Sequence, residues 1–274
     1  MFRKPYYLIP VALAACLVQN ASADSTWSGL GGDGLWANPL NWSGGVVPGN
    51  NGNVFLDAGN GWSTITIQAG ETETPGISDT YGMIYGPEWG ATLNIYGSLS
   101  TSWYLAPIGA AGNPSTINMY GNSSYSSEGI GLGYNWWFNA APYVNMNMYD
   151  SSTVNINYFF WGGHLTLNGG TFTTKGVNDG NSDVVSDATR LMNITGGELV
   201  LNFGDQTTLV QGWISRGILE AYGGGGTILI DTTSSPGETI VTASPVPEPA
   251  SIALLGLGGF AMVLAFRRRS GTTS

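Results

Sequence analysis

The chain has 274 residues, 42 of them glycine, and only 9% of its residues are charged. Two of the eight basic residues precede residue 24 and three follow residue 266, so residues 24–246 hold three basic residues against seventeen acidic ones, a net charge near −14. This charge disfavours nucleic acid and anionic lipid surfaces as partners, because phosphate binding needs clustered lysine and arginine. Helix-forming residues are scarce and no long 3.6-residue periodicity appears, which predicts a β-rich exported protein.

The first 23 residues have the three parts of a secretory signal peptide. Two basic residues come first, residues 6–18 form an apolar run, and Ala21 and Ala23 make a small-x-small cleavage site. Cleavage after Ala23 leaves Asp24 as the mature N-terminus and sends the rest of the chain out of the cytoplasm.

A lipoprotein signal is the second interpretation of this segment, because residues 13–16 resemble a lipobox in which Cys16 is lipidated. The two residues that follow Cys16 are apolar, whereas lipoproteins usually continue into a polar tether. We therefore favour cleavage after Ala23. The mature chain then has no cysteine, which excludes disulfides and cysteine-based zinc sites.

Residues 24–63 form an opening rich in tryptophan and glycine, with Trp27, Trp36 and Trp42 spaced through turn residues. Large aromatic residues in such a segment predict a cap over the exposed end of a β core. A first short strand is expected at 53–57. The opening resembles the N-terminal segment of secreted bacterial proteins that carry autotransporter-associated β-strand repeats.

A short pattern recurs seven times between residues 64 and 231 and predicts the fold. Each copy reads apolar, polar, apolar, polar or tyrosine, then a turn of small residues, and successive copies start 19 to 29 residues apart. Neighbouring residues of a strand face opposite ways, so the first residue of each copy should form one inward column: Ile65, Leu93, Ile117, Met146, Leu165, Met192 and Leu219. Strands joined at glycine corners and stacked in this way predict an all-β ectodomain, a right-handed parallel β-helix or solenoid.

The same alternation predicts two outward rows on this strand. One row is Thr66, Asn94, Asn118, Asn147, Thr166, Asn193 and Glu220, and the other is Gln68, Tyr96, Tyr120, Tyr149, Asn168, Thr195 and Tyr222. The uneven spacing of the copies keeps a second fold open, a β-sandwich with a turn about every 8–12 residues. In that fold the inward residues would lie in antiparallel hairpins.

Aromatic residues are the best lead to a ligand, because the chain has ten tryptophans and thirteen tyrosines and exposed rings are a common platform for sugar faces. Trp136, Trp137 and Phe138 lie in one of the longest excursions from the repeat, where binding residues usually collect. Three adjacent rings cannot all point into one core, so at least one should be exposed or packed against another loop. An exposed ring would contact a glycan, and the acidic domain favours a neutral polysaccharide. The competing interpretation is structural packing.

Two groups of residues could carry chemistry, and each has an ordinary structural interpretation. Asp179, Asn181 and Asp183 alternate as ligands do in a calcium loop, but no bidentate glutamate follows, and Asx-Gly runs are ordinary turns. The single histidine, His164, is either a general base or a turn residue, and no Gly-x-Ser-x-Gly elbow accompanies it. We therefore predict no catalytic residue, no metal and no cofactor.

Residues 232–246 have the composition of a linker rich in serine, threonine and proline. The tripeptide that follows is Pro247-Glu248-Pro249. Its prolines prevent a helix from starting earlier and keep the tripeptide extended. An extended tripeptide in front of a membrane segment is what a processing enzyme could recognise.

Residues 250–266 are uncharged and apolar and predict a C-terminal transmembrane helix. Such a helix would be about 25 Å long, slightly short of a hydrocarbon core of about 30 Å. Three arginines then hold the end of the chain on the cytoplasmic side of the membrane: Arg267, Arg268 and Arg269.

The order of these parts, with Gly256, Gly258 and Gly259 inside the apolar segment, resembles the PEP-CTERM sorting signal of Gram-negative bacteria that secrete exopolysaccharide. The resemblance implies recognition by exosortase, a membrane-embedded transpeptidase-like protease that removes the helix. It further implies export by the secretion machinery, a precursor anchored in the inner membrane, and release to the cell surface or extracellular matrix. The alternative is a plain C-terminal anchor behind a proline-rich linker.

Two classes of function remain open. The first is a non-enzymatic surface or matrix protein, structural or adhesive, that is associated with exopolysaccharide. The second is a glycan-active enzyme, a polysaccharide lyase or glycosidase, on a β-helix scaffold. Glycosidases need two carboxylates about 5–10 Å apart, and no paired carboxylates recur in the repeat. We expect the first class.

Overall fold

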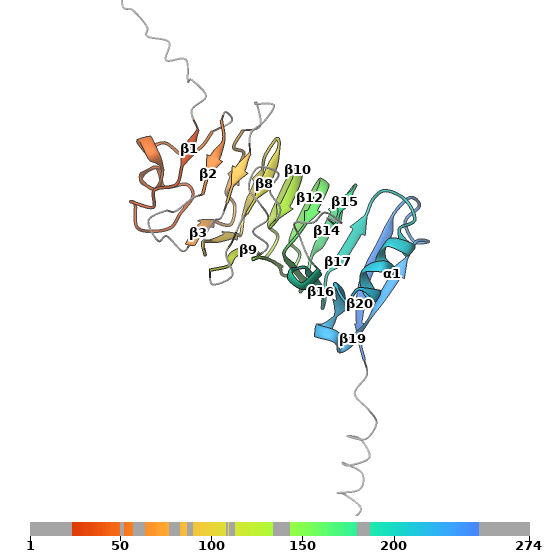
Figure 1. The fold of residues 1–274 in the computed structure, drawn as a ribbon. Helices are drawn as coiled ribbons and strands as arrows, with labels where there is room; N and C mark the ends of the chain where they lie inside the picture. The colour runs from red at the N-terminus through yellow and green to blue at the C-terminus, as the bar shows by residue number, and fades with distance from the viewer. Residues whose placement is uncertain are drawn as a thin grey trace, which may run out of the picture.

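The computed structural model describes residues 24–49, 52–56, 64–76, 83–86, 90–107, 109, 113–133, 143–179 and 187–246. They form an elongated stack of strands, with β1 (Ser25–Thr26) at one end and α1 (Thr207–Ser215) at the other (Figure 1). The predicted signal peptide with Ala21 and Ala23, and the C-terminal segment from 247 onward, lie outside the described residues.

Among the described residues, the first face of the stack is a parallel sheet of seven strands. These are β3 (Thr64–Ile67), β6 (Thr92–Ile95), β9 (Ser115–Met119), β11 (Val144–Met148), β13 (His164–Leu167), β16 (Leu191–Ile194) and β18 (Leu219–Ala221). The predicted inward column is confirmed, because its seven residues are partners from strand to strand and each is at most 2% exposed. Parallel pairing shows that the β-sandwich alternative is wrong. The right-handed sense of the coil stays a prediction.

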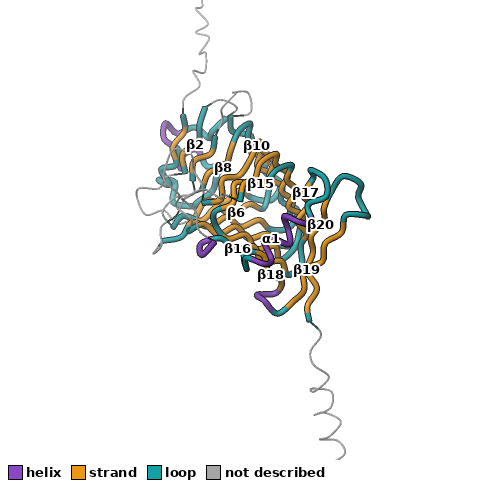
Figure 2. The backbone as a smooth tube through the Cα atoms, turned by 45° about the vertical axis from the view of Figure 1, so that its right-hand side comes forward, coloured by secondary structure: helices purple, strands orange, loops and turns teal. Residues whose placement is uncertain are grey.

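The other sheet has thirteen strands in the described part of the chain and wraps around the rest of the coil (Figure 2). Its strands besides β1 are β2 (Val54–Phe55), β4 (Thr72–Glu73), β5 (Ile84–Tyr85), β7 (Ser98–Ser100), β8 (Tyr104–Ala106), β10 (Ser124–Leu132), β12 (Thr153–Trp161), β14 (Thr171–Thr174), β15 (Val177–Asn178), β17 (Glu198–Leu201), β19 (Gly226–Asp231) and β20 (Thr239–Pro245). The start of β10 pairs with β7 and its later part with β8, so one long strand covers two faces. We call the β4–β7–β14–β17 side the second face and the β2–β5–β8–β15 side the third face.

Glycine is required where the first face turns into the second, because successive corners stack backbone on backbone. A Cβ on Gly97 would lie 2.4 Å from the carbonyl oxygens of both Gln68 and Glu71. A Cβ on Gly170 would lie 2.1 Å from the carbonyl oxygen of Ser152, and Gly170 also has a φ of +72°, which disfavours side chains. At these corners a small residue is therefore a packing requirement, whereas Gly70, Gly121 and Gly223 have open space beside them and a positive φ.

The N-terminal end of the stack is covered by a cluster of buried tryptophans. Trp42 meets Trp27 and Trp36 edge to face, with ring centroids 5.0 and 4.8 Å away. The indole N–H of Trp42 donates a 2.7 Å hydrogen bond to the carbonyl oxygen of Trp36. Leu35 forms a parallel bridge with Thr66 of β3, so this segment continues the first face. The cluster thus shields the exposed edge of the first coil.

The C-terminal end is closed by α1 and by the hairpin of β19 and β20. Trp213 of α1 is buried and meets Trp161 edge to face at 5.4 Å. β20 pairs antiparallel with both β17 and β19. The linker predicted for residues 232–246 is therefore wrong for 239–245, because Thr239 and Val241 are fully buried beneath the last coil. The described residues also contain four 3-10 turns: η1 (Pro39–Asn41), η2 (Ser43–Gly45), η3 (Asp187–Thr189) and η4 (Tyr222–Gly224).

Candidate functional site: the outward aromatic surfaces

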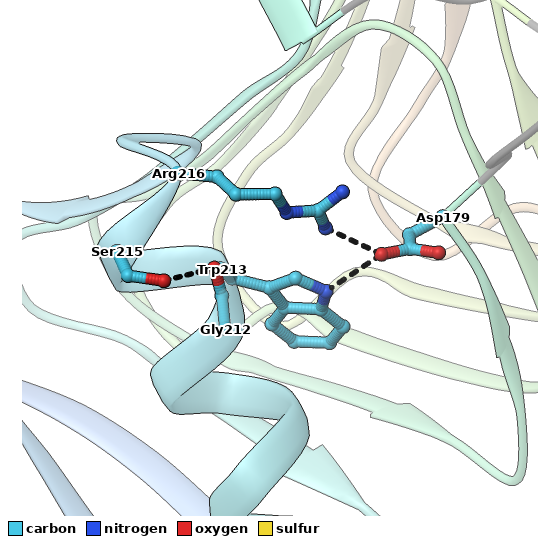
Figure 3. A network of polar contacts seen from close by, with 5 residues as sticks. All are labelled: Asp179, Gly212, Trp213, Ser215 and Arg216. Carbon is cyan, nitrogen blue, oxygen red and sulfur yellow. Dashed lines mark hydrogen bonds and ion pairs between the residues drawn. The ribbon is translucent and has the colours of Figure 1, made fainter.

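Asp179, the first residue of the candidate calcium loop, is engaged with the C-terminal helix. Its carboxylate accepts a hydrogen bond from the guanidinium of Arg216 and a 3.2 Å bond from the indole N–H of Trp213 (Figure 3). The other two candidate ligands, Asn181 and Asp183, lie outside the described residues. In this structure the Asp179 carboxylate therefore connects α1 to the third face, beside the end of β15.

His164 is exposed at the start of β13, in register with Asn145 and Leu191. It borders a hollow of about 290 Å³ that is also lined by Pro114, Tyr143, Val144 and Thr189. None of the described residues that line this hollow carries a carboxylate. The hollow therefore offers an imidazole without an acid to orient it, which a Ser-His-acid arrangement would need.

The outward rows of the first face form the two ladders that the repeat predicts. In one row the side-chain amide of Asn118 donates to Asn94 at 3.0 Å, and the amide of Asn147 donates to Asn118 at 2.9 Å. In the other row the rings of Tyr96 and Tyr120 stack at 4.8 Å, and Tyr120 and Tyr149 stack at 5.0 Å. The asparagines are register partners in neighbouring strands, and backbone hydrogen bonds from Tyr120 to Ile95 and from Tyr149 to Met119 continue the same register to the tyrosines.

The tyrosine ladder exposes only part of its apolar surface. Burial and the neighbouring Tyr149 and Tyr96 raise the pKa of Tyr120. Stacked rings cover one another's faces, and the most exposed ring of the stack is its first member, Tyr96, at 43% exposure. Tyr96 and Tyr120 border a hollow of about 430 Å³ at the glycine corner, together with Glu71 and Asn122. This corner has an apolar wall and polar groups beside it, as ligand sites usually do.

The third face carries apolar side chains on both of its surfaces. Its inward row belongs to the main core and contains Val54, Ile84, Leu105, Ile130 and Phe159. Its outward surface carries a second cluster, made of Met83, Tyr104, Ala106 and Phe160 with Tyr85 and Trp103 packed against it. We call this second group the outer aromatic cluster. Met83, Tyr104, Ala106 and Phe160 are buried, so this group packs as a second, smaller core outside the wall, and a contact surface is available only at its exposed margin.

A glycine in β10 makes room for the outer aromatic cluster. Gly129 lies opposite Tyr104 on one side and Tyr158 on the other. A Cβ on Gly129 would lie 2.3 Å from the Tyr104 ring, so only glycine lets that ring lie across the strand and meet Phe160 edge to face at 5.7 Å. Burial, followed by the charge of Glu128, raises the pKa of Tyr104 to about 12. The Tyr104 hydroxyl therefore stays protonated at neutral pH.

Tyr158 is the exposed part of this surface, with 49% of its area accessible and its ring centroid 6.4 Å from that of Phe160. Next to it in β12, Asn157 donates a 2.7 Å hydrogen bond from its amide to the carboxylate of Glu128. An apolar ring beside a fixed amide and carboxylate offers a sugar both a face to stack on and hydrogen-bonding groups.

The three aromatics predicted to contact glycan, Trp136, Trp137 and Phe138, lie outside the described residues. In the sequence they follow Leu132, the last residue of β10, by only a few residues. The outer aromatic cluster itself is absent from the sequence-based prediction. The sequence feature that could have indicated this cluster is the run Phe159-Phe160-Trp161. It breaks the alternation of a half-buried strand and indicates apolar contact on both surfaces of the strand.

The coiled stack of parallel strands defines the described part of the chain as a β-solenoid protein. Residues 245–269 match the family model of the PEP-CTERM protein-sorting motif, a range that includes the tripeptide at 247–249 and the three arginines. The chain thus carries a PEP-CTERM sorting motif, and this motif implies an exported precursor with a C-terminal membrane-anchoring signal that exosortase processes.

The sorting motif leaves the ectodomain unassigned, because the match begins at the last residue of β20. Neither the curated proteins nor the solved structures contain a significant match to the chain. In the described part of the structure, no helix combines the length and the apolarity that a membrane span requires. The apolar segment at 250–266 lies outside that part.

Proposed function

We propose that this protein is a non-enzymatic component of the cell surface or extracellular matrix, structural or adhesive, which exosortase processes and which associates with exopolysaccharide. The observation that carries the proposal is the direct junction of the two parts: the sorting motif starts at Pro245, and Pro245 ends β20 of the solenoid. A rigid body is in this way attached to an export and processing signal without a spacer domain.

The solenoid suits a structural role because its strands support one another along the whole stack. Polysaccharide contact is proposed for the two outward aromatic surfaces, around Tyr96 at the glycine corner and around Tyr158 on the third face. Trp136 and Trp137, which follow the end of β10 in the sequence, are further candidates. Since residues 24–246 have a net charge near −14, neutral chains are the preferred ligands over anionic ones.

The glycan proposal is tested by retention of the processed protein on polysaccharide from its own host. Tyr158→Ala together with Tyr96→Ala should reduce retention severalfold, while Tyr143→Ala, which removes an equally exposed tyrosine away from both surfaces, should not. Unchanged retention of the double variant, with unchanged folding by circular dichroism, would show that the aromatics serve packing alone. Release of reducing sugar by the wild-type protein would instead favour the enzymatic alternative.

A further inference from the structure

The last strand of the thirteen-stranded sheet, β19, has one edge without a strand partner among the described residues. The backbone N–H of Val246 donates to the carbonyl oxygen of Gly225, in register with the β19–β20 ladder. In an antiparallel pair every second residue turns its N–H and C=O toward its partner. Odd-numbered residues of β19 therefore face β20, and Gly226, Ile228 and Ile230 direct their backbone groups away from the sheet.

This edge lacks the features by which proteins usually prevent edge-to-edge pairing. Residues 226–230 contain no charge and no proline, and the ladder to β20 runs without a bulge. Asp231 ends the strand, but its carboxylate is held in the following turn by Thr233 and Ser234, whose hydrogen bonds lower its pKa. Leu229 stands on the outer side of the strand and is 49% exposed.

The opposite end of the solenoid is different, because the cluster of Trp27, Trp36 and Trp42 covers it. The two ends therefore cannot join head to tail through open strand edges. The partner that fits an open antiparallel edge of this kind is the same edge of a second copy. A twofold axis through Ile228 or through Leu229 gives two possible registers, and each pairs even-numbered residues with even-numbered residues, whose backbone groups are the ones that point outward. In either register Asp231 meets an uncharged residue of the other copy.

We propose that β19 pairs antiparallel with β19 of a second copy and joins two solenoids end to end, and that this pairing becomes available when the sorting segment is removed. The second part rests on the proposed exosortase processing. In the pair, the two β20 strands point in opposite directions, so the two C-terminal segments leave from opposite ends of the joint.

The dimensions explain why a membrane-anchored precursor would not form this pair. The six residues of β19 span about 20 Å, whereas the three residues 247–249 reach at most about 11 Å when fully extended. If both tails of a pair entered one membrane, the joint would have to lie parallel to that membrane and close to it, because the tails leave from opposite ends. The second face, which β20 and β19 continue, would then lie flat on the lipid. Along the solenoid the outward row of that face is polar and offers lipid no apolar contact, and at the joint only Leu229 of β19 and β20 in each copy is a large apolar side chain that is exposed. The row is Thr72, Ser98, Ser124, Thr153, Thr171 and Glu198.

The pairing is tested by the mass of the processed protein in sedimentation equilibrium. Wild-type protein should have twice the mass of one copy, and Leu229→Lys should reduce it to one copy, because a lysine on the edge strand opposes pairing. Leu40→Lys is the matched control, since Leu40 is also an exposed leucine but lies at the capped end, and it should keep the double mass. Thr227→Lys provides a second edge variant if Leu229→Lys fails to fold by circular dichroism.

The outcomes separate the pairing from the processing. The intact mass of the same sample reports whether the tail was removed, and a retained tail contradicts the proposed function. In that case the full chain in detergent, which frees the tails from a common plane, still tests the pairing. A single-copy mass of folded wild-type protein, or a double mass of both edge variants, overturns the proposal. The full chain, labelled with a fluorophore at Leu30→Cys and held in native nanodiscs, should photobleach in one step, as expected for a single copy. Two-step bleaching would show that the precursor already pairs, which refutes the claim that removal of the sorting segment makes the pairing available.

Discussion

Replacement of Leu165 by alanine tests the inward column at its centre. Leu165 is fully buried, between Met146 and Met192 in the neighbouring strands. Removal of its three outer carbons from a packed column should lower the free energy of unfolding by about 2–5 kcal/mol, the usual range for buried leucine. Coils above and below hold the backbone in place, so little collapse into the cavity is possible and the upper half of the range is expected.

The matched control for this change is Thr166→Ala, one residue further along β13. Thr166 belongs to the outward row, so its replacement should change the free energy of unfolding by no more than about 0.5 kcal/mol. Urea unfolding followed by the fluorescence of the buried tryptophans measures both variants. Equal shifts of the two midpoints, or a Leu165→Ala effect below about 1 kcal/mol, would refute the inward assignment of the column.

Three further changes test the ends and the third face. Trp213→Ala should destabilise the C-terminal end by about 3–5 kcal/mol, because a fully buried indole is lost, and thermal unfolding by calorimetry measures it. Asp179→Asn should cost at most about 1 kcal/mol, as expected for a partly exposed ion pair, and a larger loss would indicate a further role. Burial raises the pKa of Tyr104 from 10.0 to about 12, so its contribution to stability is complete below pH 10 and is lost as the pH rises through about 12. The free energy of unfolding, measured as a function of pH between about 9 and 12, should show this decrease in the wild-type protein and lack it in Tyr104→Phe.

The periodic part of the fold could be predicted because the strand alternation and the corner chemistry point to the same structure. Leu93 and Leu165 lie where the pattern places them, and the tyrosine row around Tyr120 stacks as the register requires. The glycine at Gly97 could be recognised as a corner for the same reason, since any side chain would meet the backbone of the preceding turn.

The parts that the sequence did not predict depend on tertiary contacts. The strand at 239–245 has the composition of a linker, and only its burial against the last coil makes it part of the sheet. Helix α1 contains threonine, valine and glycine, which are weak helix formers, and the burial of Val210 and Trp213 stabilises it. The outer aromatic cluster combines residues from separate strands around Gly129, and no local pattern connects them.

The central claim is that a rigid solenoid is delivered by a sorting signal that begins where its last strand ends. The most direct test is the intact mass of the mature protein from a host with exosortase and from the same host without it. The account predicts that exosortase removes the segment containing residues 250–274 and leaves the folded part from Asp24 to Val246 complete. A mature protein that still contains Arg267 to Ser274 in the presence of exosortase would contradict it.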